Sequence, residues 1–181
     1  MKFLLHTCCA PCLVTFITGF KNENLRPDLY WYNLNIHPFT EYRFRKDSLI
    51  AFAKDEGLEL IIEDEYGLRQ FIRGTYSPDG TIDDNRCRFC YHSRLEKTVK
   101  TAVEKQYDVF STTLLASPYQ KHEMIKQICE KLASQYNIDF YYKDYRSGYR
   151  EGQNKARARG CYMQKYCGCI FSEEERYLNV L

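Results

Sequence analysis

Eight of the nine cysteines in this 181-residue sequence fall into three short groups that lie far apart along the chain. The groups are Cys8, Cys9 and Cys12; Cys87 and Cys90; and Cys161, Cys167 and Cys169. A single Cys-x-x-Cys motif is typical of a redox pair, whereas several clustered thiolates are soft ligands for zinc or iron. Two such motifs and a third group favour a metal centre. The ninth cysteine, Cys129, lies in an amphipathic pattern, and we interpret it as a small core residue.

The choice of metal stays open at this point. Structural zinc takes four thiolate or imidazole ligands, which leaves four of the eight clustered cysteines without a role. An iron–sulfur cluster also takes four thiolates, and the spacings match neither common ferredoxin pattern. The surplus of thiols indicates a cluster with a second metal beside it.

Two histidines stand at the ends of predicted strands. His6 lies two residues before Cys8, so it is either a metal ligand or proton donor, or a satisfied core residue. His37 is followed by Pro38, which favours an extended backbone at the end of the second strand. On that side of the sheet His37 could take part in binding or acid–base chemistry.

Length and composition indicate one folded domain, residues 1–181, in a reducing compartment. Hydrophobic residues make up 44% and charged residues 28%, which is ordinary for a globular protein. The formal net charge of +2 means that any affinity for nucleic acid must come from local patches. No signal-peptide core and no membrane-length apolar run is present, so we expect a cytoplasmic protein with no membrane partner. The sequence contains neither a phosphate-binding G-x-x-x-x-G-K-[ST] loop nor a G-x-G-x-x-G fingerprint.

Apolar runs of strand length alternate with helical patterns, which predicts an α/β fold with a parallel five-stranded sheet. The predicted strands are 2–7, 28–37, 58–66, 108–117 and 138–145. The predicted helices are 12–20, 40–57, 68–75, 86–106 and 117–137, with 76–85 a loop. Thr40 is expected to cap the second helix and Gly57 to end it. If the strand order is 3-2-1-4-5, the first cysteine group and residues 112–120 leave the sheet at one crevice, where ligands bind in such folds.

The segment 146–181 differs from the rest and reads as a Cys-rich, basic, helical C-terminal extension broken at Gly160 and Gly168. Between Lys143 and Lys165 seven basic residues face two acidic ones, a local excess of five positive charges. Interleaved tyrosines at 145, 149 and 162 could stack on unpaired bases, as RNA-binding surfaces do. The alternative is a solvated helix face.

Five motifs in order closely resemble the QueH family of epoxyqueuosine reductases, over residues 3 to 172. They are LLHTCCAPC, YNLNIHPFTEYRFR, DDNRCRFCYHSRLEKT, FSTTLLASPYQ and YCGC. The resemblance implies a HUP-like (Rossmann-like) domain that binds a [4Fe-4S] cluster and an additional mononuclear iron. It also implies two-electron deoxygenation of the epoxide of epoxyqueuosine at the wobble position of a tRNA, with an external electron donor.

The resemblance carries site residues with it. The implied metal ligands are Cys8, Cys9, Cys12, Cys87, Cys90, Cys167 and Cys169. We expect His6 and Tyr91 as proton donors and Asp84 as an oxygen ligand to the extra iron. The residues expected to contact the base or the phosphates of the tRNA are His37, Arg43, Arg45, Arg94, Thr112, Thr113, Tyr119 and Arg150. A monomer is favoured.

Two rival functions stay open from the sequence. An iron–sulfur enzyme that adds sulfur to tRNA or removes it would use a similar cluster. A zinc-stabilised RNA-binding module without catalysis would use the same thiols for folding alone.

Overall fold

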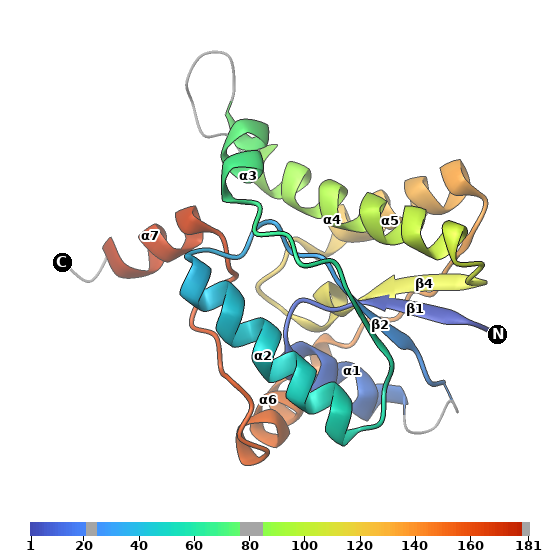
Figure 1. Ribbon diagram of the computed structural model, residues 1–181, viewed down its shortest axis with the longest axis horizontal. Coiled ribbons are helices and arrows are strands. Elements are labelled where there is room, and N and C mark those ends of the chain that lie inside the picture. Colours follow the sequence, from blue (N-terminus) through green and yellow to red (C-terminus); the bar gives the residue numbers. More distant parts are fainter. Residues whose placement is uncertain (21–24, 77–84, 179–181) are drawn as a thin grey trace.

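The fold is a parallel five-stranded sheet with helices on both faces (Figure 1), described by a computed structural model at residues 1–20, 25–76 and 85–178. The strand order is β3-β2-β1-β4-β5, and every pair of neighbours is parallel. The strands are β1 (Phe3–His6), β2 (Asp28–Trp31), β3 (Leu60–Ile62), β4 (Val109–Thr112) and β5 (Asp139–Phe140). The predicted fold class and the order 3-2-1-4-5 are confirmed.

Helices form a layer on each face of the sheet. On one face lie α1 (Ala10–Phe20), α2 (Phe39–Asp55) and α6 (Tyr149–Ala158), and on the other α4 (Asn85–Glu104) and α5 (His122–Tyr136) (Figure 1). Two shorter helices, α3 (Leu68–Thr75) and α7 (Ile170–Leu178), lie at the edge where β1 ends. The 3-10 turns are η1 (Thr113–Ala116) and η2 (Arg146–Gly148).

The sheet separates two hydrophobic clusters, one under each helical layer. Successive side chains of a strand point to opposite faces, so Leu4 packs with Ile125 of α5 while Leu5 packs with Leu13 of α1. Strands buried on both faces produce the continuous apolar runs from which the parallel sheet was predicted.

Several predicted boundaries are wrong. The predicted strand 28–37 ends at Trp31, and its remainder is a buried loop. The predicted strand 108–117 ends at Thr112, because the Thr112 hydroxyl accepts a hydrogen bond from the amide of Leu114 and caps the turn η1. The predicted helix 117–137 begins only at His122.

The two predicted ends of α2 have different outcomes. The helix begins at Phe39, directly after Pro38, and no side chain caps it, so the predicted cap at Thr40 is wrong. Gly57 has φ of +62° and donates its amide to the carbonyl of Lys54, which confirms it as the residue that ends this helix.

Within the three described ranges, no helix is both long enough and apolar enough to cross a membrane.

Candidate metal centre

The first cysteine group lies where β1 ends and α1 begins. The sulfur atoms of Cys8, Cys9 and Cys12 all lie within 4.8 Å of one another, and all three residues are buried. The Cys8 and Cys9 sulfurs are 3.7 Å apart, well beyond the roughly 2.05 Å of a disulfide bond. Three free thiols therefore converge on one point.

Their proton affinities differ although the sulfurs are adjacent. Hydrogen bonds from the thiols of Cys12 and Cys9 hold the pKa of Cys8 well below its usual value. Burial raises the pKa of Cys9, and the hydrogen bond to Cys8 raises that of Cys12. Cys8 is therefore the thiolate of the group, and the thiols of Cys9 and Cys12 keep their protons. A bound metal ion would displace these protons, because cysteines bind metals in the deprotonated form.

The second group lies in the first two turns of α4. Cys87 and Cys90 are three residues apart, so their side chains share one face of the helix. Arg94, one turn further on, donates hydrogen bonds to the Cys90 sulfur (3.1 Å) and to the Cys90 carbonyl (3.0 Å). Burial raises the pKa of Cys90 to about 11, while the Arg94 charge opposes that rise.

The third group lies just before α7. The Cys167 and Cys169 sulfurs are 3.9 Å apart, and a hydrogen bond from Cys169 lowers the pKa of Cys167 to about 5. Gly168 has φ of +132°, and a Cβ at this position would lie 3.2 Å from both Arg45 Nη1 and Asn35 Nδ2. Glycine is therefore the residue that lets the chain turn both sulfurs to the same side.

One buried cation, the guanidinium of Arg94, interacts electrostatically with a thiol of each of the three groups. Burial favours the neutral form of Arg94, but nearby Cys90, Cys8 and Cys167, one thiol from each group, outweigh it and raise the pKa of this side chain. Cysteines of the three groups also share a single hydrophobic cluster. Thiols from three distant segments therefore converge at the carboxyl edge of the sheet.

A second buried cation, Arg45 of α2, fixes the third group in place. Its guanidinium donates to the carbonyls of Cys167 (3.0 Å) and Tyr166 (2.9 Å) and pairs with Glu41 at 2.7 Å. Burial opposes its charge, but the thiol of Cys9 and the carboxylate of Glu41 raise its pKa. Arg45 thus ties the tail to the core and places a positive charge beside the thiols.

His37 joins the loop after β2 to the same tail. Its amide donates to the carbonyl of Gly168 (2.7 Å), and its Nδ1 accepts from the amide of Ile170 (3.3 Å). Its Nε2 donates to the carbonyl of Leu34 at 3.0 Å. Burial lowers the pKa of His37 to about 4, so the ring is neutral at physiological pH, and neither ring nitrogen is available to a ligand.

His6 is held in a similar way at the end of β1. Its Nε2 faces the carbonyl of Tyr32 (3.2 Å) and its Nδ1 the hydroxyl of Thr112 (2.9 Å). Burial, with the charge of Arg94, lowers the pKa of His6 to about 4. A neutral ring with both nitrogens paired links β1 to β4 and to the loop after β2.

Other predicted site residues border the thiols. Thr113 Oγ1 accepts the amide of Cys8 (3.2 Å) and lies 3.5 Å from its sulfur. Tyr91 donates to Gln120 Oε1 at 2.8 Å, and burial raises its pKa. Tyr119 is 81% exposed and packs edge-to-face against Tyr149. The roles of these residues in proton transfer or base binding stay predictions.

The predicted arginines divide into two kinds. Arg43 and Arg150 are exposed and stay candidates for RNA contacts. Arg45 and Arg94 are each 2% exposed and bound to the protein itself. The expectation that these two contact phosphates is therefore corrected, because no RNA backbone can reach a guanidinium enclosed by the core.

The remaining predictions concern Asp84, Cys161 and Cys129. Asp84, with most of the predicted loop 76–85, lies outside the described residues. Cys161 packs against the hydrophobic cluster on the opposite face of the sheet, apart from the other thiols. Cys129 is fully buried in α5, which confirms it as a core residue.

Sequence reasoning missed two amides at the site. Gln164 Nε2 lies 3.0 Å from the Cys9 sulfur. Asn33 donates to the carbonyl of Thr7 (3.0 Å), and its Oδ1 lies 3.5 Å from Arg94 Nη1. The signal for Asn33 was an amide inside an otherwise apolar run, because a buried amide needs hydrogen-bond partners.

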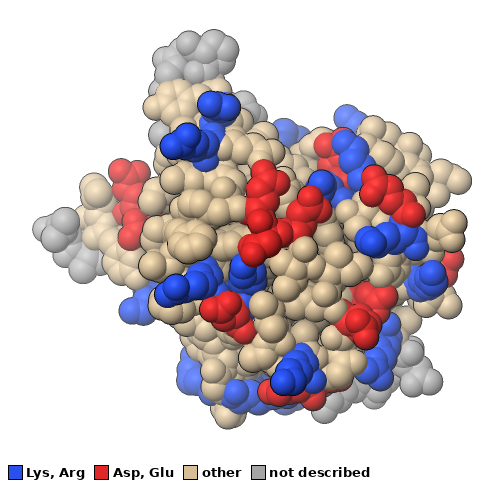
Figure 2. All heavy atoms as spheres, in the orientation of Figure 1, with Lys and Arg blue, Asp and Glu red and all other residues tan. Residues whose placement is uncertain are grey.

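Three of the seven basic residues in the basic stretch pair with acidic neighbours. Arg146 pairs with Asp144 (2.6 Å), Lys155 with Glu151, and Arg159 with Glu56 of α2. On the face in Figure 2, basic side chains gather along the lower edge, where α6 lies, with acidic ones among them. Asp144 and Glu151 already belong to the local count, so Glu56 lowers the excess of positive charge by one.

The comparisons with known proteins agree with one another. A family model described as "Epoxyqueuosine reductase QueH" matches residues 3–175. The chain is 35% identical to a protein of that name from Dehalococcoides mccartyi over 176 residues, covering 97% of this chain and 94% of that protein. It is also 35% identical to the one from Thermotoga maritima over 180 residues, covering 96% and 91%.

A solved structure also aligns with this chain. It is the U34-tRNA thiolase NcsA from Methanococcus maripaludis with its [4Fe-4S] cluster, with a TM-score of 0.42 and 12% identity, covering 93% of this chain and 76% of that one. That likeness is too distant to carry an argument. The family match and the two relatives confirm the resemblance read from the five motifs. This chain belongs to the epoxyqueuosine reductase QueH family, a family of oxidoreductases.

Proposed function

We propose that this protein reduces epoxyqueuosine in the anticodon of a tRNA to queuosine, and that the converging thiols hold the iron that the reaction needs. The observation that carries the proposal is that cysteines of three distant groups share one buried cluster, in a chain that matches the epoxyqueuosine reductase family along nearly its whole length. A tRNA substrate implies that the protein works in the cytoplasm, and we propose that it acts as a monomer.

The residues present fit a [4Fe-4S] cluster with a mononuclear iron beside it. The proposed ligands are Cys8, Cys9, Cys12, Cys87, Cys90, Cys167 and Cys169. All seven are free, and their number exceeds the four that one cluster or one structural zinc takes. Buried Arg45 and Arg94 offset the negative charge that several thiolates bring into the core. When bound, these iron groups supply one-electron transfer and Lewis acidity.

The reaction removes one oxygen atom and leaves an alkene. Both carbon–oxygen bonds of the epoxide break, two electrons from an external donor form the carbon–carbon double bond, and two protons leave with the oxygen as water. Of the two predicted proton donors, Tyr91 keeps a hydroxyl proton at neutral pH, which it donates to Gln120. His6 is neutral with both nitrogens paired.

Exposed residues near the carboxyl edge of the sheet, where the thiols lie, are the ones that contact the tRNA. Tyr119 and Tyr149 present aromatic rings on which an unpaired base can stack. Arg43 and Arg150 are exposed cations that can contact phosphates. Thr112 and Thr113 act on the thiol side, where their hydroxyls hold His6 and Cys8 in position.

The test is an anaerobic assay with iron-loaded protein, dithionite and tRNA that carries epoxyqueuosine, followed by mass analysis of the nucleosides. We expect conversion to queuosine with loss of one oxygen atom and no change in sulfur content. A change in sulfur content would instead favour tRNA thiolation or desulfuration. Protein that contains zinc and no acid-labile sulfide, and that leaves the nucleoside intact, would favour an RNA-binding module.

A further inference from the structure

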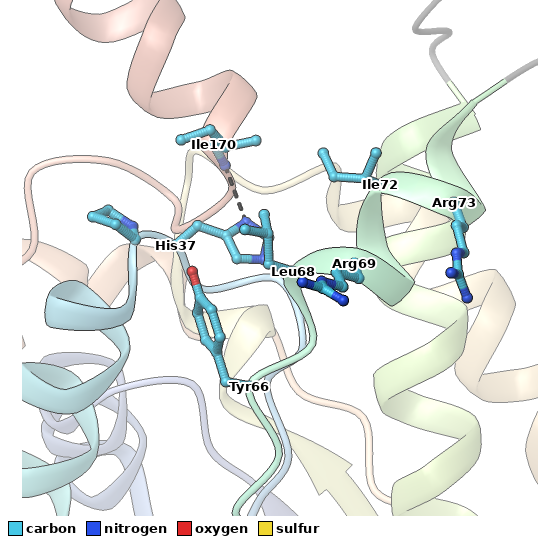
Figure 3. Close-up of a pocket in the computed structure, with 8 residues that line it drawn as sticks. His37, Tyr66, Leu68, Arg69, Ile72, Arg73 and Ile170 are labelled. Atoms are coloured by element: carbon cyan, nitrogen blue, oxygen red, sulfur yellow. Dashed lines mark hydrogen bonds between the residues drawn. The ribbon is translucent and has the colours of Figure 1, made fainter.

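A cavity of about 460 Å³ opens beside the metal centre, between the corner at His37 and the helix α3 (Figure 3). Its walls are the side chains of Pro38, Leu68, Ile72 and Ile170 and the rings of His37 and Tyr66. A volume of this size accepts a small planar ligand. None of these residues has a role in the proposed chemistry.

The cavity offers shape and aromatic surface rather than a hydrogen-bond pattern. Both ring nitrogens of His37 are paired within the protein. The His37 and Tyr66 rings meet edge-to-face at 5.7 Å, which fixes their orientation. Burial raises the pKa of Tyr66, so its hydroxyl is a neutral donor. A ligand here is held by stacking and apolar contact, with little discrimination of its polar edges.

Two arginines supply positive charge at the mouth. Arg69 and Arg73 lie one turn apart on α3, are exposed, and extend beside the cavity (Figure 3). Among the residues that the structure describes, neither forms an ion pair or a hydrogen bond. Two unpaired guanidiniums beside an apolar slot match a nucleotide, with its base inside and its phosphates at the rim.

The cavity shares a wall with the third cysteine group. Ile170 directly follows Cys169, and its amide binds the ring of His37. The amide of His37 in turn binds the carbonyl of Gly168. A base in the cavity therefore lies against the segment that presents Cys167 and Cys169.

We infer that this cavity holds an unpaired base of the tRNA anticodon loop that neighbours the modified nucleotide, with Arg69 and Arg73 on the adjoining phosphates. This inference rests on the proposed function. The modified base itself carries a cyclopentane diol and an epoxide, whose several oxygens need more polar partners than the hydroxyl of Tyr66 in the largely apolar wall. A neighbouring base needs only a stacking surface.

The test measures affinity, by fluorescence anisotropy, for a labelled anticodon stem-loop without the modification. The variants are Ile72→Trp, which fills the cavity, and the exposed double variant R69A/R73A. The matched control is K105A/K131A, which removes two exposed positive charges, one directly after α4 and one on α5. We expect Ile72→Trp and R69A/R73A each to weaken binding about tenfold and the control to leave it unchanged. R69A/R73A should also lower the slope of log affinity against log salt by about 1.4, as expected for two phosphate contacts on a single strand.

A second arm removes the base instead of the cavity. An abasic site at one neighbour of the wobble position should weaken binding to the wild-type protein about tenfold and have no further effect on Ile72→Trp. The inference fails if R69A/R73A binds like the control, or if abasic sites at both neighbours leave wild-type affinity unchanged. Either result, in a protein that still reduces the modified tRNA, would overturn the cavity assignment and leave the proposed function intact.

Discussion

The nine cysteines divide by position into seven proposed ligands and two others, and this division can be tested one residue at a time. Cys87→Ala removes one proposed ligand, a half-buried cysteine in the first turn of α4. We expect loss of iron, of the broad absorbance near 400 nm and of activity, because an iron–sulfur cluster depends on its thiolate ligands.

The matched control is Cys161→Ala, which changes a half-buried cysteine on the other face of the sheet. It should keep the wild-type iron content and spectrum. A Cys87→Ala protein that keeps its absorbance and full activity would exclude this residue from the site.

His37 predicts a pH dependence of stability. Its pKa is about 4 in the folded protein against a usual 6.5, so the unfolded chain binds a proton in this range that the folded protein excludes. The stability that neutral His37 contributes is therefore complete above about pH 6.5 and is lost as pH falls toward 4. The wild-type protein should lose up to about 3 kcal/mol more than His37→Gln between pH 7 and pH 4.

The measurement is urea unfolding of the metal-free proteins across this pH range. Glutamine cannot titrate, so the difference between the two curves isolates the imidazole. Parallel curves would show that His37 is not buried as a neutral ring.

At the scale of elements, Arg45 makes the tail part of the site. Arg45→Ala leaves Glu41 and two carbonyls without their buried partner, which should cost about 3 to 5 kcal/mol in the free energy of unfolding and lower the iron content. Arg45→Lys should restore only part of both, since one ammonium cannot reproduce the planar set of donors.

The control is Arg43→Ala on the exposed side of the same helix, which should change neither the unfolding curve nor the iron content. If Arg45→Ala loaded iron normally and unfolded at the wild-type denaturant concentration, the tail would need another anchor.

Close packing of α6 on α1 predicts that alanine lowers the stability of the protein at one glycine of this region and not at another. A Cβ on Gly152 would lie 2.1 Å from Thr15 Oγ1 and 2.6 Å from Thr15 Cα, so Gly152→Ala must push the helices apart, at about 1 to 3 kcal/mol. Gly148→Ala, at the start of the same helix, meets nothing within 4 Å and should leave stability nearly unchanged. Thermal unfolding compares the two, and equal melting temperatures would contradict the observed helix spacing.

The elements also show where sequence reasoning stops. The parallel sheet could be predicted because helices alternate with apolar runs, and parallel strands need such crossovers. The ends of β2 and β4 could not be predicted, because residues 32–37 and Thr113–Ala116 are as buried as the strands that precede them. Burial makes a loop and a strand look alike in sequence, and hydrogen bonds from distant segments decide between them.

At the scale of the whole molecule, local charge was a poor guide. The stretch 143–165 carries five excess positive charges, but Arg159 pairs with Glu56, more than a hundred residues away. Arg69 and Arg73 form no ion pair among the described residues, and they lie on the short helix α3 rather than in the basic stretch. A positive surface depends on which segments the fold places together, and that information is absent from a linear count.

Convergence of the cysteines, by contrast, follows from the topology. The carboxyl ends of β1 and β4 meet at one edge, so the first group had to lie there once the strand order was set. The third group could not be placed in this way. It reaches the edge through Arg45 and His37, whose contacts with the tail span more than a hundred residues of sequence.

The most direct test of the convergence is the visible spectrum and the iron-to-sulfide ratio of protein purified without air. The account predicts a broad absorbance near 400 nm that dithionite bleaches, with more iron than acid-labile sulfide because a mononuclear iron accompanies the cluster. A colourless protein that stays free of iron and sulfide after anaerobic reconstitution would contradict it.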